Sequence, residues 1–196
     1  SMGRLVDLSH AIEHGMVTYP GLPGPVISDF LGREASRGHY AEGTTFHIAR
    51  VRMVANTGTY LDAPFHRFAH GKDVAGVPLD SLADLPGVVI DASDRGDGEA
   101  LSAADVRARL PRDLRPLDIV LVHTGRDRFY DELDYIARGP GVSAEATRWL
   151  HDQGVRVMGI DAWGWDAPLH MQAERAKASG EAGVFWEAHQ VDLDYS

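Results

Sequence analysis

The sequence predicts an α/β fold in which helices flank a mixed sheet. Apolar stretches of strand length recur at residues 87–91, 118–124 and 155–161, and stretches with helical spacing separate them. A long stretch rich in β-branched residues occupies residues 44–54. Strands that alternate with helices are typical of α/β domains. No repeat or linker divides the chain, so residues 1–196 are expected to form a single domain.

The composition argues against several classes of partner and of metal ligand. The 196 residues suffice for one domain with a sizeable core, and 44% of them are hydrophobic. The net charge of -10 argues against nucleic acid and anionic membrane surfaces as partners. The chain has no cysteine, so any metal must be held by His, Asp, Glu or neutral oxygens. No apolar stretch reaches the ~18 residues of a membrane span, and a signal-peptide core is absent, so a cytoplasmic location is expected.

The first third of the chain is expected to be mostly extended. Residues 5–10 alternate in polarity and predict a strand, whereas the Gly- and Pro-rich residues 15–25 predict a loop. The β-branched residues 44–54 predict a second strand. Residues 79–85 predict a short helix or turn.

The rest of the chain alternates between strands and helices. Residues 87–91 predict a buried strand, and residues 101–110 predict a helix with Ser102 as its N-cap. Residues 118–124 predict the next strand. Residues 143–153 predict a helix closed by Gly154, and residues 155–161 predict the last strand.

Polar residues stand where three of the predicted strands end, namely Asp91, Thr124 and Asp161. Sites in α/β sheets often gather at the carboxyl ends of strands. Aspartate after a strand is also a common turn or capping residue, so this pattern alone leaves both interpretations open. The charged residues Arg126, Asp127 and Arg128 are expected to form a solvated cluster.

The segment 56–66, Asn-Thr-Gly-Thr-Tyr-Leu-Asp-Ala-Pro-Phe-His, carries the most chemical information. Asn56, Tyr60, Asp62 and His66 have the same parity, so an extended chain would place them on one face. A straight strand would separate Asp62 from His66 by roughly 13 Å. Gly58 and Pro64 are expected to supply the bends that bring them together.

Four interpretations of Asp62 and His66 remain open on residue types alone. They are suitable ligands for Zn²⁺ or Mn²⁺. They also suit a hydrogen-bonded turn, an acid–base pair without metal, or part of a polar network around a small ligand.

The residues Thr57-Gly58-Thr59 followed by Asp62-Ala63-Pro64-Phe65-His66 resemble the signature His-x-Gly-Thr-His-x-Asp-x-Pro-x-His of the putative cyclase family. That family includes bacterial kynurenine formamidase and isatin hydrolase. The resemblance extends to residues 5–10, 123–125 and 159–161. It implies a swivelling β/β/α fold and a metal-dependent hydrolase of amides, lactams, lactones or esters. A polyketide-type cyclase or dehydratase, or a binding protein that has lost its metal, are the alternatives.

The departures from the signature bear on the metal. The first two histidines of the signature correspond here to Asn56 and Tyr60, which are poorer ligands than neutral imidazole. The resemblance implies that Asp62, His66 and His189 hold one Zn²⁺ or Mn²⁺ ion, if any, with an open position for water. The late Glu or Gln ligand of the family would lie beyond Ser196, so a closing C-terminal strand region is expected to be missing from the sequence.

The remaining expectations concern substrate and assembly. Tyr60 is expected to donate a hydrogen bond to the oxyanion, Asn56 to orient substrate or water, and His66 to take part in catalysis. Trp163, Trp165 and Asp166 follow the last predicted strand and are candidates for a pocket around a small-molecule substrate. Two tryptophans that cover the edge of the core are the alternative. The resemblance implies a homodimer or homotetramer.

Overall fold

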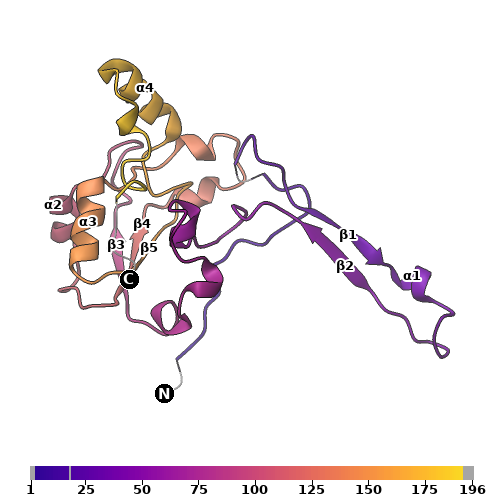
Figure 1. The fold of residues 1–196 in the computed structure, drawn as a ribbon. Coiled ribbons are helices and arrows are strands. Elements are labelled where there is room, and N and C mark those ends of the chain that lie inside the picture. Colours follow the sequence, from indigo (N-terminus) through magenta and orange to yellow (C-terminus); the bar gives the residue numbers. More distant parts are fainter. Residues whose placement is uncertain (1–2, 18, 192–196) are drawn as a thin grey trace. The chain divides into compact units, whose positions relative to one another are not determined.

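The computed structural model describes residues 3–17 and 19–191 (Figure 1). It forms two compact units, Ser1–Leu61 and Asp62–Ser196. The α/β class predicted from the sequence is confirmed, but parallel and antiparallel pairing occur in separate sheets. Residues 192–196, after which the missing C-terminal strand region was expected to follow, lie outside the described residues.

The first unit is built around an antiparallel ribbon of two strands, β1 (Val26–Leu31) and β2 (Ile48–Arg52). The register shifts between Asp29 and Leu31, which leaves Phe30 as a bulge residue. The short helix α1 (Arg33–Ser36) follows β1. The buried Ser36 hydroxyl accepts a hydrogen bond from the Phe46 backbone nitrogen at 2.9 Å, which ties the two arms of the ribbon together.

The sequence predictions for this unit hold only in part. The loop at residues 15–25 is confirmed for its described residues. The strand expected at 44–54 is confined to Ile48–Arg52, and β1 was not anticipated. The strand expected at residues 5–10 is wrong, since these residues have no strand pairing. Alternation marks a chain that can be extended, but a strand also requires a neighbouring strand.

The second unit contains a parallel sheet in the order β3 (Gly87–Asp91), β4 (Ile119–His123) and β5 (Val157–Ile160). The helix α2 (Ala103–Arg109) connects β3 to β4, and α3 (Ala144–Asp152) connects β4 to β5. The helix α4 (Leu169–Ser179) follows β5. All three strands and the helices α2 and α3 confirm the sequence predictions to within a few residues, and the turn expected at 79–85 contains the 3-10 helix Leu79–Ser81.

The helices begin and end where their capping residues predict. The Ser102 hydroxyl accepts from the Asp105 nitrogen at 3.1 Å, while the Asp105 carboxylate accepts from the Ser102 nitrogen at 2.9 Å, which completes a capping box. The Ser143 hydroxyl caps α3 by accepting from the Ala146 nitrogen at 3.1 Å. Gly154, in the left-handed region with φ +87, follows α3.

The core lies between α2, α3 and one face of the parallel sheet (Figure 1). Val88 and Ile90 of β3 and Val120 and Val122 of β4 point into it and are fully or almost fully buried. The alternating residue Val89 on the opposite face is 55% exposed. The strand predicted at residues 87–91 is therefore present and buried on one face, since burial alternates along it. Within the described residues, no helix has the length and apolar character to cross a membrane.

Candidate functional site

Asp62 and His66 are brought together by a tight turn at the start of the second unit. Pro64 opens the 3-10 helix Pro64–His66, whose first position suits its fixed φ. The His66 nitrogen donates to the Ala63 carbonyl at 2.9 Å, and the turn leaves the His66 Nδ1 atom 3.4 Å from the Asp62 Oδ1 atom. The bend expected at Pro64 is therefore present, in place of the ~13 Å spacing of a straight strand.

Asn56 and Tyr60 belong to the first unit and form a pair of their own. The Asn56 amide nitrogen donates to the Tyr60 hydroxyl at 3.0 Å. Gly58, with φ +70, turns the chain between them as the sequence predicts. The buried Thr57 hydroxyl donates to the Val54 carbonyl at 2.7 Å and holds this turn in place. The catalytic roles expected for Asn56 and Tyr60 stay predictions.

His189, the third expected metal ligand, is held by Asp166. The Asp166 carboxylate is 5% exposed and accepts hydrogen bonds from the Ala188 nitrogen at 2.8 Å and the His189 nitrogen at 3.2 Å. The same carboxylate is in close contact with the His189 Nδ1 atom. From the sequence, Asp166 is a candidate pocket residue and His189 a candidate metal ligand. The structure shows that the two side chains form a pair. Their separation of 23 residues gives no sequence signal for it.

The two tryptophans after β5 have different surroundings. The Trp165 indole nitrogen donates to the Thr147 hydroxyl at 2.9 Å, and its ring packs against the core. Trp165 therefore covers the edge of the core, as the alternative interpretation predicts. The Trp163 ring lies against that of Trp186 with 5.8 Å between centroids, and Trp186 meets the His189 ring edge-to-face at 5.4 Å.

The donors Asp62 and His66 fit two positions of a divalent metal site. Two ligand atoms bound tetrahedrally at 2.0–2.1 Å lie roughly 3.3 Å apart, close to the 3.4 Å between Asp62 Oδ1 and His66 Nδ1. A carboxylate and an imidazole are ligands that Zn²⁺ and Mn²⁺ accept. Within the described residues, no group of three or more His, Asp or Glu side chains is arranged to hold a metal ion. The geometry thus supports a two-ligand set and leaves the three-ligand expectation a prediction.

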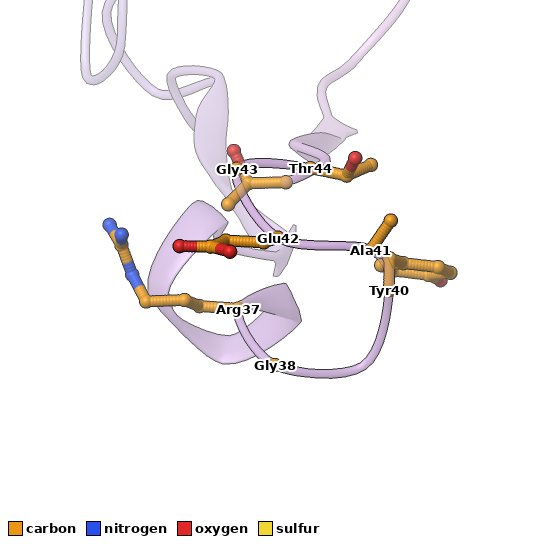
Figure 2. A pocket seen from close by; sticks show the side chains of 8 residues that line it. Arg37, Gly38, Tyr40, Ala41, Glu42, Gly43 and Thr44 are labelled. Atoms are coloured by element: carbon orange, nitrogen blue, oxygen red, sulfur yellow. The ribbon is translucent and has the colours of Figure 1, made fainter.

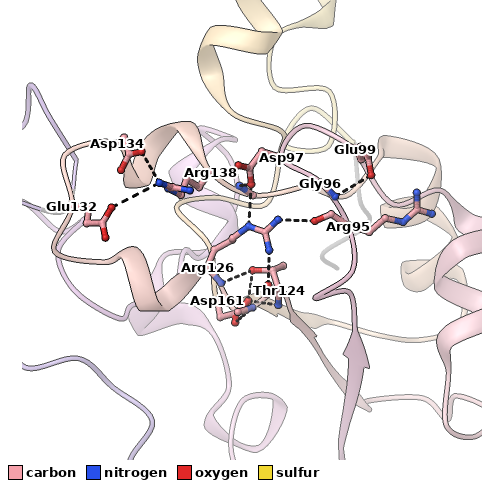
Figure 3. Close-up of polar contacts among 12 residues, drawn as sticks. Arg95, Gly96, Asp97, Glu99, Thr124, Arg126, Glu132, Asp134, Arg138 and Asp161 are labelled. Carbon is pink, nitrogen blue, oxygen red and sulfur yellow. Dashed lines mark hydrogen bonds and ion pairs between the residues drawn. The ribbon is translucent and has the colours of Figure 1, made fainter.

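Thr124 and Asp161, the polar residues that directly follow β4 and β5, lie together (Figure 3). Asp161 accepts from the Thr124 nitrogen at 2.6 Å, the Thr124 hydroxyl at 2.7 Å and the Gly125 nitrogen at 2.8 Å. His123 lies between two carboxylates, with Asp91 at 3.8 Å and Asp161 at 3.9 Å. These bonds join the ends of β4 and β5, so Asp161 acts here as an anchor of the backbone.

Arg126 is not solvated, contrary to the expectation for its charged cluster (Figure 3). Its side chain is 12% exposed and donates to the Asp97 carboxylate at 2.9 Å and to the Arg95 carbonyl at 2.6 Å. Burial alone would raise the pKa of Asp97, but hydrogen bonds from the Gly139 nitrogen and Arg126 outweigh it and hold that pKa below its ordinary value. The sequence shows Arg126 beside other charged residues and therefore suggests a solvated side chain. Its burial depends on Asp97 and Arg95, which lie on loops distant in the sequence.

Each of the two units carries a surface hollow. Figure 2 shows the first, of about 270 Å³, in the turn between α1 and β2. It is lined by Arg37, Gly38, Tyr40, Ala41, Glu42, Gly43, Thr44 and Thr45. The second, of about 410 Å³, lies beside α2 and α3 around Arg107 and Trp149. Neither is lined by a residue that the sequence assigns to the site.

Comparison with known proteins places these features in a family context. The model of the family described as "Putative cyclase" matches residues 6–167. The chain is 30% identical over 164 residues to a kynurenine formamidase of Erythrobacter litoralis, an alignment that covers 83% of this chain and 67% of the relative. It is 27% identical over 169 residues to cyclase-like protein 1 of Oryza sativa, covering 81% of this chain and 57% of the rice protein. This chain thus spans less than two thirds of the rice relative.

Solved structures agree on the fold. Isatin hydrolase A from Labrenzia aggregata superposes with a TM-score of 0.66 at 24% identity, covering 85% of this chain and 70% of that one. A protein from Bacillus stearothermophilus described as a predicted metal-dependent hydrolase has a TM-score of 0.62 at 22% identity, covering 96% of this chain and 78% of that one. Since the family model matches well over half of its residues, the chain belongs to the putative cyclase family.

Proposed function

We propose that this chain is a hydrolase of a small amide, lactam, lactone or ester, with Asp62 and His66 at the centre of its site. The observation that carries the proposal is the 3.4 Å approach of His66 Nδ1 to Asp62 Oδ1. The two side chains are 38% and 43% exposed, so water and a small substrate can reach them. The names of two relatives, kynurenine formamidase and isatin hydrolase, support this class of reaction.

The pair can move the proton that hydrolysis requires. As water attacks the carbonyl carbon, the His66 imidazole accepts a proton from it, and Asp62 stabilises the imidazolium that forms. The proton then passes to the leaving nitrogen or oxygen as the bond between that atom and the carbonyl carbon breaks. Hydrolysis of this kind consumes one water and needs no other reactant.

The finer form of the proposal places one Zn²⁺ or Mn²⁺ ion on Asp62 and His66. When bound, such an ion supplies Lewis acidity and lowers the pKa of water. Asp62 and His66 then serve as ligands that fix its position, in place of the acid–base role. The separation of their donor atoms, close to that of two tetrahedral ligands, supports this form.

Both forms are tested by Asp62→Asn and His66→Gln. Protein purified without chelators is analysed for bound metal by mass spectrometry, and hydrolysis of isatin, of N-formylated kynurenine and of a simple aryl ester is followed by chromatography. We expect each substitution to lower hydrolysis by at least about 100-fold, the usual scale of acid–base catalysis. Loss of bound metal in the same variants would support the finer form.

The chain offers a matched control in another exposed pair of the same types. His47 Nε2 lies 2.7 Å from Asp29 Oδ1, with side chains 42% and 63% exposed. The substitutions Asp29→Asn and His47→Gln should leave metal content and hydrolysis unchanged. The proposal would be contradicted if hydrolysis were unchanged in Asp62→Asn and His66→Gln, or if it fell equally in the control variants.

We also propose that the chain works as a homo-oligomer. An isolated two-stranded ribbon is marginally stable in water, yet β1 and β2 expose Phe30, Ile48 and Val51 by half or more of their surface. Association between copies would cover this apolar surface and stabilise the ribbon.

A further inference from the structure

The close contact between Asp166 and His189 is more than a surface ion pair, because the carboxylate is buried. Asp166 is 5% exposed and lies at the start of the segment that leads into α4. The hydrogen bonds to its two oxygens come from residues 188 and 189. One carboxylate therefore fixes both the backbone and the ring of the later segment.

The donors around Asp166 determine which nitrogen of His189 carries hydrogen. Two backbone N–H groups donate to this carboxylate, so both of its oxygens act as hydrogen-bond acceptors. The ring atom in contact with it, Nδ1, must then be the donor. In a neutral imidazole this leaves Nε2 with its lone pair, as a base or a ligand requires.

The orientation of the imidazole is fixed from a second side. The Trp186 ring meets it edge-to-face, with 5.4 Å between centroids and 78° between planes. The Trp186 nitrogen in turn donates to the Gln172 side-chain oxygen at 2.7 Å, and Gln172 is 2% exposed. The His189 side chain remains 28% exposed, so the held ring is still reachable from solvent.

The backbone beside Asp166 is equally constrained. Gly141 has φ +77, and a Cβ atom on it would collide with the backbone of Asp166 and Ala167. The Val142 nitrogen donates to the Trp165 carbonyl at 2.8 Å. The carboxylate is thus carried by a segment that packs directly against the chain entering α3.

We propose that Asp166 is the positioning residue for His189, holding it as the Nδ1–H tautomer so that Nε2 is the nitrogen through which His189 acts. The part of His189 in hydrolysis rests on the proposed function together with the expectation that His189 is a third ligand beside Asp62 and His66, whereas the tautomer does not. A carboxylate behind a reacting or ligating imidazole fixes its tautomer and orientation, and its removal usually costs 10–100-fold in activity or metal affinity.

The variant Asp166→Asn tests this assignment because it keeps the shape and changes the donor. Its amide NH₂ would donate to Nδ1 while its oxygen still accepts from the backbone, so the ring should switch to the Nε2–H tautomer. Protein labelled with ¹⁵N-histidine reports the tautomer by NMR, with His189→Gln used to identify the resonances. We expect Nδ1–H in the wild type, Nε2–H in Asp166→Asn, and a 10–100-fold lower kcat/KM in the variant.

Asp118→Asn is the matched control, since Asp118 is also a buried, hydrogen-bonded carboxylate. It should lower stability without changing the His189 tautomer or kcat/KM. The wild-type spectrum decides the assignment even where Asp166→Asn does not fold, and an Nε2–H wild type would overturn it. Failure to hydrolyse any substrate, with the expected tautomers observed, would instead reject the proposed function and leave the positioning role standing.

Discussion

Buried aspartates illustrate how single residues shape this protein. Asp118 is 1% exposed and accepts from both terminal nitrogens of Arg112, at 2.6 and 2.9 Å, and from the Arg115 nitrogen at 2.8 Å. The hydrogen bond from Arg112 holds the pKa of Asp118 below its ordinary value. A carboxylate with a lowered pKa contributes stability above its unfolded pKa and loses that contribution as the pH falls through its folded pKa.

Asp118→Asn should therefore lower the free energy of unfolding at pH 7 by about 2 kcal/mol, the scale of a hydrogen bond to a charged group. The difference from the wild type should shrink as the pH falls below about 3.9, the ordinary pKa of aspartate, because the wild-type carboxylate then also becomes neutral. Urea unfolding between pH 7 and pH 2.5 measures it. A difference that is constant over this range would show that the charge of Asp118 contributes nothing.

Site residues were predictable from the sequence where their geometry is local. Asp62 and His66 are four residues apart, and Pro64 between them indicates the turn that brings their side chains together. The contact of Asp166 with His189 was not predictable, because it requires the chain to leave through α4 and return. Arg126 was misjudged for the same reason, since two of its acceptors, Asp97 and the Arg95 carbonyl, lie on loops about 30 residues earlier.

At the scale of the element, the capping box of α2 offers a clean test. Ser102→Ala removes the acceptor for the Asp105 nitrogen and the donor to the Asp105 carboxylate. We expect the free energy of unfolding to fall by about 1 kcal/mol, the usual cost of an N-cap serine. Chemical denaturation measures it against Ser28→Ala, an exposed position on β1 that should stay within about 0.5 kcal/mol. Equal stability of the two variants would show that the cap is dispensable.

Elements with their own signals were predicted well, and those defined by distant partners were not. α2 and α3 carry a capping serine and helical periodicity, so both were recognised. The strands of the parallel sheet are recognisable in the sequence as apolar stretches. β1 lacks a comparable signal, and its strand geometry depends on pairing with β2. Residues 5–10 show the converse, a strand-like pattern without a partner strand.

For the whole molecule, the proposed self-association through the ribbon leads to a direct measurement. We expect light scattering to give a mass of at least two chains for the wild type. The double substitution Phe30→Thr and Val51→Thr keeps residues suited to strands but removes apolar surface, and should lower that mass. Leu79→Thr with Leu133→Thr, at positions 75% and 82% exposed in the second unit, is the matched control. A monomeric wild type would contradict the proposal.

The family could be inferred from the sequence, chiefly from residues 56–66, and the family model that matches residues 6–167 confirms it. The completeness of the metal site could not. A signature shows which ligand types are kept, here Asp62 and His66, but the position of a ligand from a distant segment depends on packing. His189 lies with Asp166 and Trp186, which no pattern near Asn56 or Tyr60 could have indicated.

The contacts at the base of α4 also bear on how this protein can be altered. Gln172 donates to the Ala167 carbonyl at 2.6 Å and accepts from the Trp186 nitrogen, while Asp166 holds residues 188 and 189. These contacts close the base of the segment that runs from Gln172 to Trp186. Its tip is exposed to solvent at Ser179, Gly180 and Glu181. Lengthening such a closed loop costs little entropy. The turn at Gly180 is therefore a natural place to insert an epitope or a reporter peptide without moving His189.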